Sequence, residues 1–287
     1  MHASGPPPDT LDDALRWGRA ELAASSESAA LDAEVLLLHV LDCTRSALRA
    51  WPERLIDRER AARFQALIGR RREGWPVAYL TGEREFWSRS FHVGPGVLIP
   101  RHETELLIEL ALERLPPDAG ADILDLGTGS GIIALTLAAE RPGCRVSAID
   151  ASTKAIATAQ HNALRLGLGR VRFVPGHWLD PLAAHDRFDL MVSNPPYIPE
   201  QDPHLGQGDL LYEPREALAS GSDGLAALRE IIDLGRAHLN PGGWLILEHG
   251  YDQSDSVAAL LAGCAYREMS HHRDLQGHRR ATVARYG

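Results

Sequence analysis

The stretch "ADILDLGTGSGIIALTLAAE", residues 121–140, decides the fold. It opens with an apolar run of strand length and closes with an apolar run that suits a buried helix. Gly127, Gly129 and Gly131 lie between the two, where glycines let the backbone approach a ligand and point helix N-terminal N–H groups at it. The spacing is G-x-G-x-G, and it lacks the G-x-G-x-x-G form of dinucleotide sites. We therefore predict a strand–loop–helix unit whose ligand has no pyrophosphate.

The alternation of strand and helix continues beyond this unit. Ser152 is expected to cap a helix over 153–166, and a longer helix over 224–239 is expected to end in a turn at 240–243. Further short apolar strands are predicted at RVSAID, VRFV, FDLMVS and WLILE, which are residues 145–150, 171–174, 188–193 and 244–248. Such alternation predicts an α/β domain with a mostly parallel sheet and helices on both faces.

An acidic residue follows the glycines at the end of the second predicted strand. The carboxylate of Asp150 can there accept hydrogen bonds from both hydroxyls of a ribose. Two simpler explanations exist, since a glycine loop can serve close packing alone and Asp150 can merely cap the next helix. Both features occur in register, and together they favour a nucleoside cofactor.

The fourth predicted strand runs into Asn194-Pro195-Pro196-Tyr197. Proline fixes φ, gives up its N–H and pushes the residue before it towards extended geometry. This acceptor loop, residues 194–197, could simply end a strand. Alternatively, it is a stiff segment that holds the Asn194 amide and backbone carbonyls towards a planar ligand.

The second interpretation suits the methylation of an amide or aromatic amine. Such a nitrogen is a poor nucleophile because its lone pair is delocalised, and full decoupling of an amide costs on the order of 18–20 kcal/mol. The Asn194 side-chain oxygen and the Pro195 carbonyl could accept the two N–H bonds of an –NH₂ group and aim its lone pair, while Tyr197 stacks on the flat group. Alignment of this kind supplies roughly 7–11 kcal/mol.

At these two motifs the sequence resembles the methyltransferases that use S-adenosylmethionine. "DLGTGSG" matches their first-strand signature, and NPPY at the end of the fourth strand matches their signature for methylating a planar nitrogen. The resemblance implies a Rossmann-like class I methyltransferase domain with S-adenosylmethionine as cofactor. The cofactor residues that it implies are Gly127, Thr128, Gly129, Ser130, Gly131, Asp150 and Asn194.

The chain before this domain predicts two further parts. Residues 1–75 form a small all-helical domain after a frayed, proline-rich start at 1–9, with Thr10 as the cap of its first helix. Its arginine run at 70–72 is expected to be a solvated helix end. Residues 76–100 alternate and contain Gly94-Pro95-Gly96, which predicts a hairpin-like connector that turns at these residues. The methyltransferase domain then covers 101–287.

The flanking segments resemble the bacterial methyltransferases that modify the glutamine of the Gly-Gly-Gln tripeptide in peptide chain release factors. The segments are "DAEVLLLHVLDCTRSAL", "YLTGEREFWSRSFHVGPGVLIPRHETELLIE", "LYEPREALASGSDGL" and "RDLQGHRRATVARY". The resemblance implies that the helical domain docks the release factor and that Trp178 lies against the adenine. It also implies that Asn194 touches both cofactor and substrate, and that Pro195, Pro196 and Tyr197 complete the glutamine pocket.

One residue departs from the family's pattern. Where the family has Pro-Arg-Pro-x-Thr-Glu, this chain reads "PRHETE", with His102 in place of the second proline. Proline would preset the first turn of the following helix, so His102 is expected to loosen that turn around Arg101 and Glu103.

Composition excludes several other classes of protein. The net charge of −9, from 30 basic and 39 acidic residues, argues against direct nucleic-acid binding through phosphates. Three unpaired-looking cysteines, no basic-then-apolar start and no apolar run of membrane length favour a cytoplasmic protein. No metal-ligand spacing occurs, so no metal is expected, and His271, His272 and His278 are predicted to lie in a solvated loop.

Three alternatives remain open from the residues alone. The NPPY motif is equally compatible with methylation of a glutamine in a ribosomal protein and of an adenine in DNA, since each offers a planar –NH₂ group. An adenine-specific DNA enzyme would need a target-reading domain and a basic face. A non-catalytic module that only binds the cofactor is the third alternative.

Overall fold

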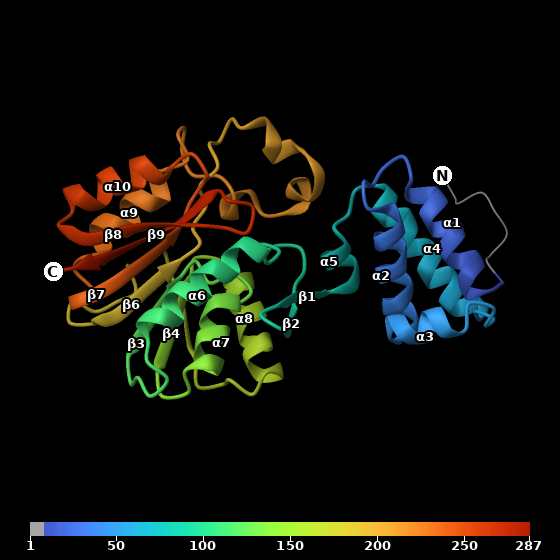
Figure 1. Cartoon of the computed structure of the whole chain (residues 1–287), viewed down its shortest axis with the longest axis horizontal. Helices are drawn as coiled ribbons and strands as arrows, with labels where there is room; N and C mark the ends of the chain where they lie inside the picture. The colour runs from blue at the N-terminus through green and yellow to red at the C-terminus, as the bar shows by residue number, and fades with distance from the viewer. Residues whose placement is uncertain (1–8) are drawn as a thin grey trace. The chain divides into compact units, whose positions relative to one another are not determined.

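The computed structural model describes residues 9–287, and this part of the chain separates into two compact units between Glu83 and Arg84 (Figure 1). The proline-rich start expected to be frayed lies, except for its last residue, outside the described residues. Within 9–287, no helix combines the length and the apolar composition that crossing a bilayer requires.

The first unit is built from helices that bury a shared apolar core. Leu36, Leu37 and Phe64 are completely buried there. As predicted, Thr10 caps the first helix, since its Oγ1 accepts a hydrogen bond from the Asp13 N–H at 3.2 Å. The helices of this unit are α1 (Leu11–Leu22), α2 (Ala29–Leu41), α3 (Arg45–Ala50), α4 (Arg58–Arg72) and α5 (Val77–Thr81).

The prediction of a solvated arginine run at the end of α4 is confirmed for Arg70 and Arg72, which are exposed, and is wrong for Arg71. Arg71 donates from Nε to Asp32 at 2.7 Å, and both side chains are largely buried, with 15% and 8% of their surface exposed. Arg70 lies over the Trp75 ring, and Arg72 pairs with a glutamate of α1. The last turn of α4 packs beside the first turn of α2, so the run meets fixed partners that its composition does not reveal.

The hairpin exists, but its predicted turn is wrong. Strands β1 (Glu83–Phe86) and β2 (Arg89–His92) are joined by Trp87 and Ser88, and Gly94-Pro95-Gly96 follows the hairpin. Both joining residues have positive φ, 50° and 56°, which a two-residue hairpin turn requires and which glycine or asparagine usually supplies. Trp87 tolerates this geometry because its backbone N–H and its indole N–H are held by Glu105 and Glu140.

The second unit contains a seven-stranded sheet in the order β5-β4-β3-β6-β7-β9-β8. The first five strands in this order pair in parallel, and β9 pairs antiparallel with β7 and β8, so the predicted mostly parallel sheet is confirmed. The strands are β3 (Asp122–Leu126), β4 (Arg145–Asp150), β5 (Arg172–Pro175), β6 (Phe188–Ser193), β7 (Leu239–Glu248), β8 (Tyr266–Arg273) and β9 (Arg279–Tyr286).

Helices cover both faces of the sheet (Figure 1). The helices that pack on one face are α6 (Glu105–Arg114), α7 (Ile132–Glu140) and α8 (Thr153–Arg165). Those that pack on the other face are α9 (Ala226–Gly235) and α10 (Ser254–Gly263). Ser152 caps α8 as predicted, its Oγ accepting from the Ala155 N–H. Short 3₁₀ helices complete the unit: η1 (His102–Thr104), η2 (Pro203–Gly206), η3 (Gly208–Tyr212) and η4 (Arg215–Ala217).

Two predictions about the last third of the chain need correction. The helix expected over 224–239 is shorter, and the turn expected at 240–243 lies inside β7, where the pairing register with β6 shifts. His271 and His272 lie on β8 and not in a loop. β8 is an edge strand with one neighbour, so polar side chains are tolerated along it and hide its strand character. Within 9–287, no three His, Cys, Asp or Glu side chains gather as metal ligands.

The strand order places the loops of interest at one edge. β3 lies between β4 and β6, and the strand order reverses direction at this point. Open parallel sheets bind ligands beyond the carboxyl ends of the strands at such a switch point. The glycine loop, residues 127–131, and the acceptor loop both leave the sheet there.

Candidate active site

The glycine loop is held against the end of β4 by backbone hydrogen bonds. Gly127 and Thr128 both donate to the Ile149 carbonyl, at 2.9 and 3.1 Å. Gly127 has φ of +72°, and a Cβ there would stand 3.3 Å from the Trp178 ring. The missing side chain therefore lets the Trp178 ring lie close to the loop backbone.

Asp150 organises the same loop from the end of β4. Its two carboxylate oxygens accept hydrogen bonds from the backbone N–H groups of Gly129 and Ser152, each at 2.8 Å. Burial raises the pKa of Asp150, and these two hydrogen bonds oppose the rise. Because a carboxylate oxygen accepts more than one hydrogen bond, capacity remains for the hydroxyls of a ligand.

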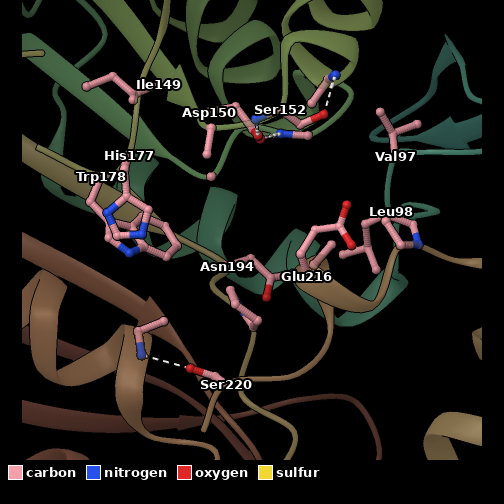
Figure 2. A pocket seen from close by; sticks show the side chains of 18 of the residues that line it. Val97, Leu98, Ile149, Asp150, Ser152, His177, Trp178, Asn194, Glu216 and Ser220 are labelled. Atoms are coloured by element: carbon pink, nitrogen blue, oxygen red, sulfur yellow. Dashed lines mark hydrogen bonds between the residues drawn. The ribbon is translucent and has the colours of Figure 1, made fainter. Parts of the chain in front are cut away.

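These residues line a cavity of about 390 Å³ at the switch point. Figure 2 shows Asp150 and Trp178 on different walls of it, with Asn194 beside Glu216. The predicted cofactor residues that line it are Gly127, Gly129, Asp150, Trp178 and Asn194, and the structure adds Val97, Leu98, Ser152, His177, Glu216 and Ser220. A volume of this size suits a small organic ligand.

Three predicted cofactor residues do not line this cavity and instead hold the glycine loop from within. The Thr128 hydroxyl donates to Asp125 at 2.6 Å, and the Ser130 carbonyl accepts from Asn162 at 2.9 Å. A Cβ on Gly131 would stand 3.1 Å from Ala159 of α8. Their contacts fix the shape of the loop that Gly127 and Gly129 present to the cavity.

Asp125 is a completely buried carboxyl beneath the glycine loop. Its Oδ2 accepts from Thr128 and from the Ala134 N–H, while its Oδ1 has no hydrogen-bond partner among the described residues. Burial raises the pKa of Asp125 to about 7. A buried oxygen without a donor favours the protonated acid, which explains the direction of the shift.

The acceptor loop lies between this cavity and a second one of about 70 Å³. Pro195 and Tyr197 line the smaller cavity, and Asn194 and Pro196 line both. No described residue donates a hydrogen bond to the Asn194 side-chain oxygen or to the Pro195 carbonyl. The two predicted acceptors are therefore free of donors from the described residues.

Three further polar groups of the acceptor loop have fixed partners. Asn194 donates from Nδ2 to the Thr104 hydroxyl at 2.9 Å. The Tyr197 hydroxyl donates to Glu248 at 3.2 Å, and the Tyr197 carbonyl accepts from Gln253 at 2.9 Å. Burial and the nearby Glu248 charge raise the pKa of Tyr197, so the phenol stays protonated.

Arg101 lines the smaller cavity opposite the acceptor loop and pairs with Glu213. Glu213 also accepts from the Ile99 N–H at 2.9 Å; burial raises the pKa of its carboxyl, and Arg101 opposes the rise. His102 is exposed, and the turn after it is the short helix η1. Arg101 is held by its ion pair with Glu213.

The sequence analysis assigned no role to Thr104, Glu213, Glu216 or Glu248, although the first three lie in segments that resemble the family. Thr104 lies 90 residues before Asn194, and Glu248 lies 51 residues after Tyr197. No fixed spacing links such positions. For Glu248 the available signal was its place at the end of a predicted parallel strand, where ligand-facing residues gather.

Two family models match the chain. The model described as "PrmC N-terminal domain" matches residues 13–82, and the model described as "Methyltransferase small domain" matches residues 103–223. Among solved structures, a methyltransferase from Pyrococcus furiosus has a TM-score of 0.53 at 19% identity over 78% of this chain and 98% of its own. A T. thermophilus 16S rRNA N2 G1207 methyltransferase in complex with AdoMet and guanosine also scores 0.53, at 22% identity over 71% and 50%. Both show that the fold of the second unit is that of methyltransferases.

Curated relatives agree over nearly the whole chain. A release factor glutamine methyltransferase of Shewanella oneidensis is 45% identical over 96% of this chain and 96% of its own. The protein of the same name from Pseudomonas aeruginosa is 48% identical over 91% and 94%. Sequence identity this high over nearly the full length of both chains shows that they belong to one family. This agrees with the two sequence motifs and with the fold. The chain therefore belongs to the release factor glutamine methyltransferase family.

Proposed function

We propose that this protein methylates the side-chain amide nitrogen of the glutamine in the Gly-Gly-Gln motif of peptide chain release factors, with S-adenosylmethionine as the methyl donor. One observation carries the proposal: Asn194 lines two adjoining cavities and Pro195 lines the smaller one, and no described residue donates to the Asn194 side-chain oxygen or to the Pro195 carbonyl. The larger cavity suits the cofactor and the smaller one suits a narrow carboxamide.

The residues of the larger cavity fit S-adenosylmethionine. In this proposal Asp150 accepts hydrogen bonds from the ribose hydroxyls, and Trp178 lies against the adenine, beside a glycine whose missing Cβ leaves room. Gly127, Gly129 and Asn194 contact the rest of the cofactor, and Thr128, Ser130 and Gly131 hold the loop in shape. When bound, S-adenosylmethionine supplies an electrophilic methyl on a sulfonium that leaves as a neutral thioether.

The acceptor loop activates the substrate nitrogen. The Asn194 oxygen and the Pro195 carbonyl accept the two N–H bonds of the glutamine amide, which lets the nitrogen pyramidalise and directs its lone pair towards the methyl. Pro196 stiffens the loop, and the Tyr197 ring fixes the amide plane. Bound S-adenosylmethionine would supply the methyl to this nitrogen and would leave as the thioether, and the extra N–H proton would pass to water, so no metal or strong base is required.

The helical unit binds the release factor in this proposal. Trp51 and Leu55 lie between α3 and α4 and are 55% and 75% exposed, which supports an apolar protein contact on that surface. The acidic net charge of −9 supports a protein substrate over DNA or RNA. A cytoplasmic location, where release factors are found, is part of the same proposal.

The test is incubation with labelled S-adenosylmethionine and, side by side, a release factor, a ribosomal protein and duplex DNA. We expect label in the release factor alone, and mass spectrometry should locate one methyl on the glutamine of Gly-Gly-Gln. Asn194→Ala should lower turnover by about 10²–10³-fold, because one oriented acceptor is lost. Asn240→Ala is the matched control, since Asn240 bonds to Asp189 elsewhere in the sheet. Label in the ribosomal protein or DNA, or full activity of Asn194→Ala, would contradict the proposal.

A further inference from the structure

The Asn194 amide has two ends of similar shape and opposite chemistry. Its Oδ1 accepts hydrogen bonds, whereas its Nδ2 only donates them. A flipped amide would therefore present donors to the –NH₂ group of the substrate and repel it. The orientation of this one side chain decides whether the site can receive an amide nitrogen, and it needs a determinant.

The determinant in the structure is a buried chain of hydrogen bonds. Asn194 donates from Nδ2 to Thr104 Oγ1 at 2.9 Å, and Thr104 Oγ1 in turn donates to Glu248 Oε2 at 2.8 Å. Thr104 is fully buried and Glu248 is 1% exposed, so water does not compete for these groups. A hydroxyl has a single hydrogen. Once Thr104 gives it to Glu248, Oγ1 can only accept, and the group that it accepts from is the nitrogen end of Asn194.

We propose that Thr104 and Glu248 are positioning residues that fix the Asn194 side-chain oxygen towards the substrate amide. The inference rests on the proposed function, because the orientation matters only if an –NH₂ group is to be bound. The ionised Glu248 carboxylate makes Thr104 an acceptor. A protonated Glu248 could donate to Thr104 instead, which would free the threonine hydrogen to bind Asn194 Oδ1 and favour the flipped amide.

The surroundings of Glu248 agree with this role. The Tyr197 hydroxyl donates to its second oxygen at 3.2 Å, so the carboxylate holds both Asn194 and Tyr197 of the acceptor loop. Burial raises the pKa of Glu248 to about 7; the Thr104 hydrogen bond and Arg280 of β9 favour the ionised form, and Glu103 of η1 opposes it. With this pKa the carboxyl is partly ionised at pH 7 and mostly ionised in mildly basic solution; no ion pair to it occurs within the described residues, and Arg280 pairs with Asp274 instead.

Thr104→Val tests the chain of hydrogen bonds, because valine keeps the shape and removes the hydroxyl. We expect turnover at saturating S-adenosylmethionine and release factor to fall by about 10²-fold, as for a misplaced catalytic group. The dissociation constant of S-adenosylmethionine should stay within about twofold, and Thr104→Ser should restore most of the turnover, since its hydroxyl can make the same two bonds. Thr136→Val is the matched control: Thr136 is equally buried, and its hydroxyl has no partner among the described residues.

A second measurement separates this inference from the proposed function. In ¹⁵N-labelled protein without substrate, the Asn194 side-chain NH₂ signal, identified with Asn194→Ala, should exchange slowly in the wild type and in Thr104→Ser, and fast in Thr104→Val. If no substrate is methylated but this exchange pattern appears, the proposed function fails and the positioning stands. Wild-type turnover in Thr104→Val, a loss that Thr104→Ser does not restore, or unchanged exchange would overturn the positioning.

Discussion

The glycine loop and the acceptor loop leave neighbouring strands at the same edge of the sheet, but they are held in different ways. The glycine loop is fixed by partners that are nearer in sequence, 3 to 32 residues away: Thr128 bonds to Asp125, Gly129 to Asp150 and Ser130 to Asn162. The acceptor loop is fixed by Thr104, Glu248 and Gln253, which are 51 to 90 residues distant from the groups that they bind. The comparison teaches that a cofactor motif can be local, whereas an amide-orienting site requires the assembled fold.

Apart from the substitution of Asn194 itself, the largest expected effect comes from disturbing the acceptor loop without changing its residues. Gly224 has φ of +74°, and a Cβ there would overlap the Tyr197 carbonyl oxygen and stand 2.7 Å from the Gln253 amide nitrogen. Gly224→Ala must therefore displace the loop backbone, and we expect turnover to fall by about 10²-fold or more. Steady-state kinetics with release factor measures this loss.

Gly208→Ala is the control for Gly224→Ala. Gly208 also has positive φ, +54°, but its added Cβ would meet no atom within 4 Å. It carries the backbone strain without the collision, so turnover should remain within about threefold of wild type. Equal losses in the two variants would show that strain, and not contact with the acceptor loop, is responsible.

The same contrast explains what the sequence could predict. The strand after Ala121, the glycine loop, the Ser152 cap and Asp150 follow from local patterns, and their elements are where the patterns place them. The turn at Trp87-Ser88 was missed because two non-glycine residues adopt positive φ under tertiary hydrogen bonds.

The site shows the same division between local and distant determinants. NPPY marks the acceptor groups, but Thr104 and Glu248 carry no motif that links them to it, being 144 residues apart from each other. The prediction that Arg71 is solvated was wrong for the same reason, because its partner Asp32 lies 39 residues away in the sequence. Long-range partners are set by packing, which local patterns do not encode.

An intermediate effect is expected at the glycine loop. Asp150→Asn replaces the two carboxylate oxygens that accept from two backbone N–H groups with a single amide oxygen. We expect S-adenosylmethionine to bind about tenfold more weakly or worse, which corresponds to the loss of one hydrogen bond to a charged group. Turnover at saturating cofactor should change by less than about threefold, because the acceptor loop is untouched. Calorimetry and kinetics measure the two quantities.

Asp122→Asn is the control for Asp150→Asn. Asp122 lies at the opposite end of β3 and pairs with the exposed Arg145, so neither affinity nor turnover should move. If Asp150→Asn lowered turnover as strongly as affinity, the glycine loop would contribute to aligning the substrate, and the two loops would not act separately.

The smallest expected effect is a pH dependence that belongs to the acceptor loop alone. Burial raises the pKa of Glu248 to about 7, so the carboxyl gains a proton as the pH falls through this value. Only the ionised form makes Thr104 an acceptor, and one pH unit below the pKa about one tenth of the molecules remain ionised. Turnover at saturating substrates should thus fall about tenfold from the basic plateau to about pH 6.

In Glu248→Gln this fall in turnover at acidic pH should vanish, since the amide does not titrate and can still accept from Thr104. Asp125→Asn should keep this fall, although the pKa of Asp125 is also about 7, because Asp125 binds only the glycine loop and the start of α7. If the fall in turnover at acidic pH persists in Glu248→Gln and disappears in Asp125→Asn, the titrating group is Asp125. The pH dependence would then belong to the glycine loop and not to the acceptor loop.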